Sequence, residues 1–139
     1  MQVWGGSDIE VEYSTQANSI NWVNGYSGRY VDFGDAQGCP SCINGWTDYG
    51  VWFVSWGAPP AYPFPEIYYS HQVNEWTNIA QYSVNSQGVS MAFEGPMDEW
   101  HRDPNSYPAD QSWVTFHNAL ASGGVNNALP YSTSINTSQ

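Results

Sequence analysis

The sequence predicts an α/β domain with about four mainly parallel strands, because segments with strand character alternate with segments of helical spacing. Two further observations support this. The 139 residues fit one domain of roughly 100–150 residues. Hydrophobic residues make up 41% of the chain, and many are aromatic, so a substantial core can form. We therefore read the chain as one domain and take its elements in order.

The first predicted element is a strand over residues 7–13, where acidic and apolar residues alternate strictly. Asp8, Glu10 and Glu12 occupy every second position, and side chains of a strand alternate between its two faces. The three carboxylates are therefore expected on one face of this strand.

A short helix capped by Ser14 or Thr15 follows, and two glycines bound its end. Residues 29–33 form the second predicted strand. The third is the apolar run 50–56, which reads as a central strand covered on both faces. Residues 57–65 hold four prolines and predict a rigid extended loop.

The second half of the chain continues the alternation. Residues 66–69 can add a short strand, and residues 71–84 form a helix with one apolar stripe. Residues 89–94 predict a strong strand that stops at a Gly-Pro pair. The last helix begins near Ala109, and its apolar face carries aromatic residues.

These elements make about half of a (β/α)8-type barrel, since a complete barrel needs roughly 250 residues. Residues 1–124 are expected to form the domain, and residues 125–139 a polar, flexible tail. A half-barrel leaves two open sheet edges, so we expect either self-association into a homo-oligomer or a rearranged compact sheet. The abrupt start at Met1–Trp4 suggests that upstream sequence is missing.

Charge narrows the range of partners. The net charge is −11, with Arg29 and Arg102 as the basic residues and no lysine. Such a chain repels phosphate backbones and anionic lipid surfaces, so we expect neither a nucleic acid nor a membrane as partner. No apolar run is long enough to cross a membrane, and the first residues do not have the pattern of a signal peptide. Neutral polymers such as polysaccharides remain as partners.

The two cysteines, Cys39 and Cys42, are separated by two residues. This spacing is compatible with a redox motif, half of a zinc site, or a small-loop disulfide. The glycine before the pair and the Ile-Asn-Gly after it read as a loop, which favours a structural disulfide. A disulfide fits an oxidising compartment, so we expect a secreted or extracellular protein.

The Asp8, Glu10 and Glu12 cluster is the first candidate site. Like charges held close together in a dry setting raise one pKa, so one carboxyl keeps a proton near neutral pH. A general acid needs that property, and glycoside hydrolysis uses two carboxyls in this way. The alternative is an edge strand with a solvated acidic face.

Further acidic residues lie near the ends of predicted strands, where parallel α/β sheets bind ligands. Glu94 and Asp98 are candidates for the opposing catalytic carboxylate. Asp32 and Asp35 could orient a sugar hydroxyl or simply close a turn. Glu94 could instead pair with Arg102.

Four aromatic residues near strand ends are candidate walls for sugar rings, and core packing is the alternative: Trp56, Tyr68, Tyr69 and Trp100. We expect no metal and no cofactor. His71, His101 and His117 form no metal pattern, and the sequence has no Gly-x-Ser-x-Gly nucleophile elbow.

Several stretches resemble glycosidase-type barrels. The segment Gly6–Glu10 is similar to the D-x-E strand of a group of uncharacterised bacterial glycoside-hydrolase-like proteins and, more distantly, of the family 25 lysozymes. Residues 30–40, 51–59 and 91–100 also resemble the bacterial group. The resemblance implies the C-terminal half of such a barrel, with Asp8 and Glu10 as its acidic pair.

We therefore expect a glycoside hydrolase-like enzyme that acts on a polysaccharide, with Glu10 as proton donor and Asp8 as its partner. Glu12 joins the strand-end residues as a substrate-binding candidate. Two alternatives remain open. One is a non-catalytic carbohydrate- or cell-wall-binding module, and the other is an oligomerising structural domain.

Overall fold

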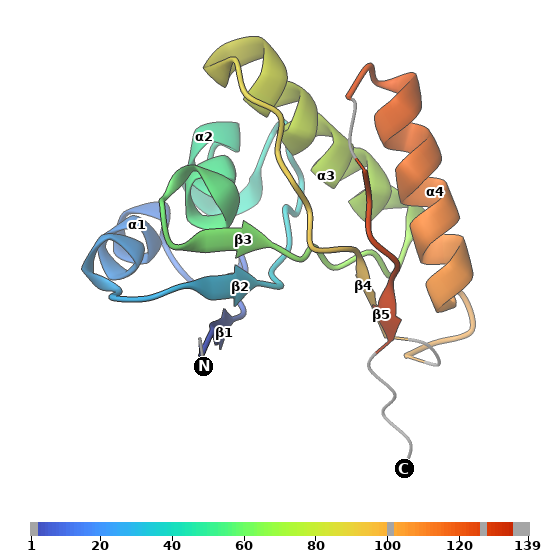
Figure 1. The fold of residues 1–139 in the computed structure, drawn as a ribbon, viewed down its shortest axis with the longest axis horizontal. Coiled ribbons are helices and arrows are strands. Elements are labelled where there is room, and N and C mark those ends of the chain that lie inside the picture. Colours follow the sequence, from blue (N-terminus) through green and yellow to red (C-terminus); the bar gives the residue numbers. More distant parts are fainter. Residues whose placement is uncertain (1–2, 100–101, 126–127, 135–139) are drawn as a thin grey trace.

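The computed structural model describes residues 3–99, 102–125 and 128–134, in which parallel strands alternate with four α-helices (Figure 1). Strands β1 (Gly5–Ser7), β2 (Tyr30–Asp32) and β3 (Ala61–Pro63) form a parallel sheet in chain order. Strands β4 (Met97–Asp98) and β5 (Thr133–Ser134) form a second parallel pair. The predicted α/β class is confirmed, and no closed barrel is present in the described part of the chain.

The helices follow from their caps and apolar stripes. Thr15 caps α1 (Gln16–Gly25) as predicted, since its side chain accepts a hydrogen bond from the Asn18 N–H at 3.3 Å. Helices α3 (Ser70–Tyr82) and α4 (Ala109–Ser122) match the two later predictions and bury Trp76 and Phe116 fully. Helix α3 continues into the π-helical turn η3 (Ser83–Gln87).

The predicted strand over residues 7–13 is wrong beyond Ser7, where β1 ends. Residues 8–10 have no regular structure and residues 11–13 form a turn. The alternation of side chains nevertheless persists, because Ile9 and Val11 are buried while Asp8 is exposed. The alternation persists because the side chains of Asp32 and Asp35 accept hydrogen bonds from the backbone N–H groups of Ile9 and Val11, in place of a neighbouring strand.

The predicted strand over residues 50–56 is also wrong. The segment forms α2 (Asp48–Trp52) and the π-helical turn η2 (Phe53–Gly57), preceded by a 3-10 turn η1 (Ile43–Gly45). A short apolar run does not distinguish a central strand from a buried helix. Thr47 decides between them, since its side chain caps α2 by accepting from the Gly50 N–H at 3.2 Å.

The third strand lies instead in the proline-rich stretch that we predicted to be a loop. The N–H of Phe64 donates to Asp32 O at 2.7 Å, and the N–H of Tyr30 donates to Pro60 O at 2.8 Å, which joins this stretch to β2. Pro63 and Pro65 flank Phe64, and backbone N–H directions alternate along a strand. The backbone nitrogens of the two prolines therefore face away from β2. Proline is tolerated there because β2 needs no N–H from those positions.

The same prolines explain why residues 89–94 form no strand. The Glu94 N–H donates to Pro63 O at 2.8 Å, but Pro63 and Pro65 have no N–H to return, so no ladder develops. Met91 and Phe93 are still buried by this extended segment. The short strand expected at 66–69 is reduced to one parallel bridge between Glu66 and Met97, which links the two sheets.

The first residues of the expected tail belong to the packed structure. Val125 and Leu129 are buried, and β5 pairs with β4. Trp113 of α4 donates its indole N–H to Leu129 O at 3.0 Å, which holds this segment against the helix. Residues 135–139 of the predicted tail lie outside the described residues.

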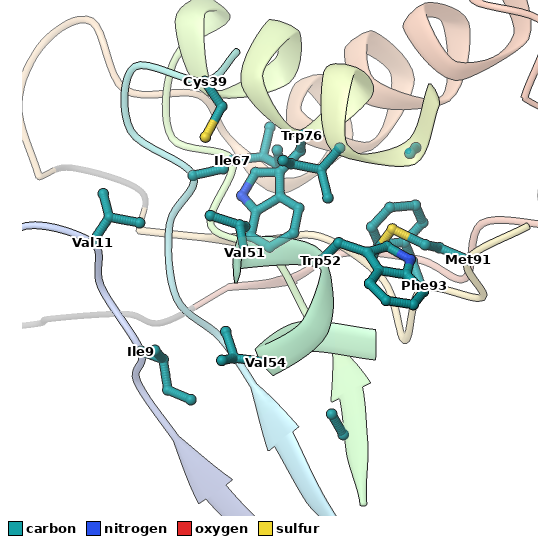
Figure 2. Close-up of a cluster of buried hydrophobic side chains, with 14 of the residues drawn as sticks. Ile9, Val11, Cys39, Val51, Trp52, Val54, Ile67, Trp76, Met91 and Phe93 are labelled. Carbon is teal, nitrogen blue, oxygen red and sulfur yellow. The ribbon is translucent and has the colours of Figure 1, made fainter. Parts of the chain in front are cut away.

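The core lies between the strands and the helices that cover them. Figure 2 shows side chains from the segment after β1, from α2 and η2, from α3 and from residues 91–93 converging in this core, with Trp76 beside Ile67. No helix among the described residues is long and apolar enough to cross a membrane. Cys39 and Cys42 form a disulfide, as favoured from the sequence.

Candidate functional site

Carboxylates stand at the carboxyl ends of four parallel strands. Asp8 directly follows β1, Asp32 ends β2, Glu66 lies three residues after β3, and Asp98 ends β4. Parallel strands bring these ends to one edge, which is where ligands bind in α/β proteins. The edge is therefore the place to look for a site.

Asp32 and Asp35 position the chain that carries the acidic pair. Asp32 is only 1% exposed, and its Oδ1 accepts from the N–H groups of Ile9 and Gly34, both at 3.2 Å. Asp35 Oδ1 accepts from the Val11 N–H at 3.1 Å. The two aspartates thus hold alternate residues on either side of Glu10. Gly34 permits this approach, because a Cβ there would lie 2.0 Å from Ile9 O.

Glu10 is the best candidate for a proton donor. Partial burial raises its pKa to about 7, and the negative charges of Asp8, Asp35 and Glu12 add to the effect. The pKa of Asp8 is also raised by burial, but a hydrogen bond with Glu10 opposes that rise. Near neutral pH the pair therefore combines a partly protonated Glu10 with a more readily ionised Asp8.

Glu66 completes the cluster. One carboxylate oxygen from each of Asp8, Glu10 and Glu66 lies within 4.8 Å of those of the other two. Burial raises the pKa of Glu66 to about 8, although the Tyr68 hydroxyl donates to its Oε1 at 2.8 Å. Glu66 is thus a second carboxyl that carries a proton near neutral pH.

Tyr68, Tyr69 and their neighbours form the far wall. Gln72 of α3 fixes this segment, since its Oε1 accepts from the backbone N–H groups of Tyr68 at 2.7 Å and Tyr69 at 3.1 Å. The Tyr69 ring stacks on His71 at 5.5 Å between centroids, and its hydroxyl donates to Asp103. The wall is therefore rigid and largely aromatic.

A cleft of about 190 Å³ opens between these walls, lined by Glu10, Glu12, Tyr13, Asp35, Gln37, Glu66, Tyr68, Tyr69, His71, Gln72, Glu75 and Arg102. A second hollow of about 390 Å³ is lined by the Asp8–Glu10 segment and by the partly exposed side chain of Trp22. Glu10 borders both hollows. A long ligand could therefore cross it from one hollow to the other.

The structure brings together some predicted residues and separates others. Glu10, Glu12, Asp35, Tyr68 and Tyr69 line the cleft, and Asp8 and Asp32 adjoin them.

The remaining predicted residues lie elsewhere. Glu94 is exposed and does not line the cleft. Asp98 is 0% exposed and accepts from the Ser134 hydroxyl at 3.0 Å. Trp56 lies in η2 and packs against the core, and Trp100 lies outside the described residues.

Sequence reasoning missed Glu66, Glu75 and Trp22 as site residues. The sequence predicts a strand over residues 66–69, and that prediction gives no indication that Glu66 follows the end of β3. Glu75 had a signal, because it is a charged residue one helical turn before the apolar Ile79 of α3, and both side chains are buried.

Beside the cleft, Asp8, Glu10 and Glu66 hold carboxyl oxygens close together, and oxygen atoms are the ligands that bind hard cations such as Ca²⁺ and Mg²⁺. Cys39 and Cys42 lie near Asp48, but their sulfur atoms are joined in the disulfide and are not thiolate ligands. The oxygen cluster is therefore the stronger of the two donor sets.

Known proteins give no further guide to this site. Comparisons with models of protein families, with curated proteins and with solved structures found no match.

Proposed function

We propose that the chain is a glycoside hydrolase-like enzyme that cleaves O-glycosyl bonds of a polysaccharide by carboxylate acid/base catalysis. One observation carries the proposal. Asp8, Glu10 and Glu66 approach within 4.8 Å at the carboxyl ends of parallel strands, and the pKa of Glu10 is about 7. Enzymes that hydrolyse glycosides use a pair of carboxyls whose environments hold them in different protonation states.

Each carboxyl has a role in this proposal. Glu10 gives its proton to the glycosidic oxygen as the bond from that oxygen to the anomeric carbon breaks. Asp8, as carboxylate, stabilises the positive charge that develops on the sugar ring. Water then supplies hydroxide to the anomeric carbon, and its remaining proton returns to Glu10. Glu66 replaces Glu94 and Asp98 as the carboxyl that faces this pair.

The architecture supports the same proposal by analogy. The strands run parallel and in chain order within each sheet, with the Glu66–Met97 bridge between the sheets, as in half of a (β/α)8 barrel. This agrees with the resemblance of the sequence to glycosidase-type barrels. The Cys39–Cys42 disulfide fits secretion, where a polysaccharide would be met.

The test is release of reducing ends from cellulose, xylan, chitin, chitosan, β-1,3-glucan and peptidoglycan. We expect Glu10→Gln to lower the rate on the cleaved substrate by about 10²- to 10⁴-fold, because it removes the transferable proton. Product configuration, followed by NMR, distinguishes a retaining from an inverting reaction. Glu94→Gln is the matched control, since it changes an exposed glutamate outside the cleft.

Two results would contradict the proposal. One is a rate that Glu10→Gln leaves unchanged while circular dichroism shows both proteins folded. The other is saccharide binding without any product, which would favour the non-catalytic binding module.

A further inference from the structure

One end of the cleft holds hydrogen-bond acceptors that lack donors. Glu75 of α3 is 9% exposed, and its Oε1 accepts from the Gly38 N–H at 2.8 Å. Its Oε2 is buried and has no hydrogen-bond partner among the described residues. The same holds for Oε1 of Gln37, the residue next to Gly38. Both residues line the cleft.

Buried acceptors without partners are costly, on the order of 1–3 kcal/mol each and more for a charged group. Proteins keep few of them, and those that remain call for an explanation such as a bound water, an ion or another ligand. The donor that would satisfy Glu75 and Gln37 therefore comes from outside the described part of the protein.

The charges around this end favour a cation as that donor. Five carboxyl groups line the cleft: Glu10, Glu12, Asp35, Glu66 and Glu75. The raised pKa values of Glu10 and Glu66 leave Glu12, Asp35 and Glu75 as the main sources of negative charge near neutral pH. Arg102 also lines it, but its guanidinium is 2.6 Å from Glu99 Oε2 and lies over the Tyr68 ring. His71 is exposed at the rim and stacks on Tyr69, and its charge partly opposes the burial that raises the pKa of Glu75. The lining therefore carries an excess of negative charge.

We propose that this end of the cleft, formed by Glu75 and Gln37, binds a protonated amino group of the substrate, so that the preferred polysaccharide consists of amino sugars with free amines. An ammonium group carries three donors and a positive charge, so it can satisfy an unpaired acceptor and offset a carboxylate charge. A neutral hydroxyl has one donor and leaves the charge of Glu75 uncompensated.

This inference rests on the proposed function, because it names the substrate of the same cleft. Glu10 and Glu66 line that cleft together with Glu75. A sugar whose amine meets Glu75 therefore belongs to a chain that also reaches the proposed proton donor.

The test is a binding experiment that does not depend on catalysis. Glu10→Gln protein is titrated calorimetrically with three tetrasaccharides, namely β-1,4-linked glucosamine, its fully N-acetylated form, and cellotetraose, at physiological salt with a chelator present. We expect the free-amine form to bind at least about tenfold more tightly, since a hydrogen bond to a charged group contributes about 1.5–3 kcal/mol.

Two further substitutions, each added to the Glu10→Gln protein, test whether the preference for the free-amine form depends on Glu75 and Gln37. Glu75→Gln keeps an acceptor for Gly38 but removes the charge, and should reduce the preference for the amine to about twofold or less. Gln37→Met removes one acceptor and should reduce it in part. Glu94→Gln removes one exposed negative charge outside the cleft, so it measures the general attraction between an acidic protein and a cationic sugar.

Equal affinity for the amine and acetylated forms would overturn the inference. So would an equal loss in Glu75→Gln and Glu94→Gln, which would mean that net charge alone attracts the ligand. Amine-selective binding that depends on Glu75 but without hydrolysis by the unaltered protein would support this inference while removing the proposed enzyme activity. Hydrolysis with no preference for amines would do the reverse.

Discussion

Carboxylates at the ends of the strands have two opposite kinds of surroundings. After β1 and β3, Asp8, Glu10 and Glu66 gather beside a cleft, and each has a raised pKa with burial as the largest cause. At the end of β4, Asp98 is 0% exposed and accepts from the Ser134 hydroxyl of β5 at 3.0 Å, and Asp32 at the end of β2 is likewise only 1% exposed. The same type of residue is therefore open to a ligand after β1 and β3 and enclosed at the ends of β2 and β4.

The difference arises in the chain that follows or flanks each strand. After β1 the backbone leaves the ladder, and the side chains of Asp32 and Asp35 accept its N–H groups instead, which leaves Glu10 facing the cleft. Strand β4 is flanked by β5 and packed by α4, so Asp98 is covered. A carboxylate at a strand end thus becomes a candidate for chemistry only where the next segment departs from the sheet.

The largest contrast is expected between Glu66→Gln and Asp98→Asn. Glu66→Gln should lower kcat by about 100-fold with little loss of stability, because it removes a carboxyl of the reacting cluster. Asp98→Asn should lower the free energy of unfolding by about 1 kcal/mol and leave kcat within about twofold, because it changes a buried hydrogen bond. Steady-state kinetics and urea unfolding measure the two effects.

A reversed result would break the comparison. If Asp98→Asn lost activity while remaining folded, Asp98 would return as the opposing carboxylate that the sequence suggested. If Glu66→Gln kept full activity, the third carboxyl of the cluster would have no role.

The like-charged cleft should also make stability fall as pH rises. The pKa of Glu10 rises from 4.5 to about 7 on folding, and that of Glu66 from 4.5 to about 8. The folded state therefore binds more protons than the unfolded state over this window, and stability is lost as the carboxyls ionise. Thermal unfolding followed between pH 4.5 and about pH 8 should show a decreasing Tm.

Removing the titrating groups tests the cause of that fall. The double variant Glu10→Gln, Glu66→Gln should flatten the dependence of Tm on pH, whereas Glu94→Gln should keep most of it. An unchanged slope in the double variant would mean that other carboxyls of this acidic chain cause the pH dependence.

The sequence predicted the class of fold and the position of the acidic pair, because both depend on local patterns. Thr15 and the apolar stripe through Trp76 indicated two helices correctly. The alternation through Asp8 and Glu10 survives although the strand does not, since Ile9 still has to be buried. Successive side chains of an extended segment point to opposite sides, so the pattern of buried and exposed residues can be read from the local sequence.

The predictions that were wrong concern features that depend on pairing between distant segments of the chain. Nothing local to residues 89–94 reveals that Pro63 and Pro65 of the neighbouring strand lack N–H donors. Glu66 could not be recognised as part of the cluster until β3 had been placed in the proline-rich stretch. The opposing carboxylate was therefore sought at Glu94, which follows a strand that does not form.

The smallest expected effect compares one exposed aromatic ring beside each sheet. Trp22 is 46% exposed in the hollow that adjoins Asp8 and Glu10, and Tyr131 is 82% exposed near β5 against Trp113. If the polysaccharide crosses Glu10 into that hollow, Trp22→Ala should raise KM about fivefold with kcat nearly unchanged, since stacking on an aromatic face contributes about 1 kcal/mol. Tyr131→Ala should leave both constants unchanged. Equal effects of the two substitutions would show that the hollow beside Trp22 is no subsite, and would confine the substrate to the cleft between Glu10 and Glu75.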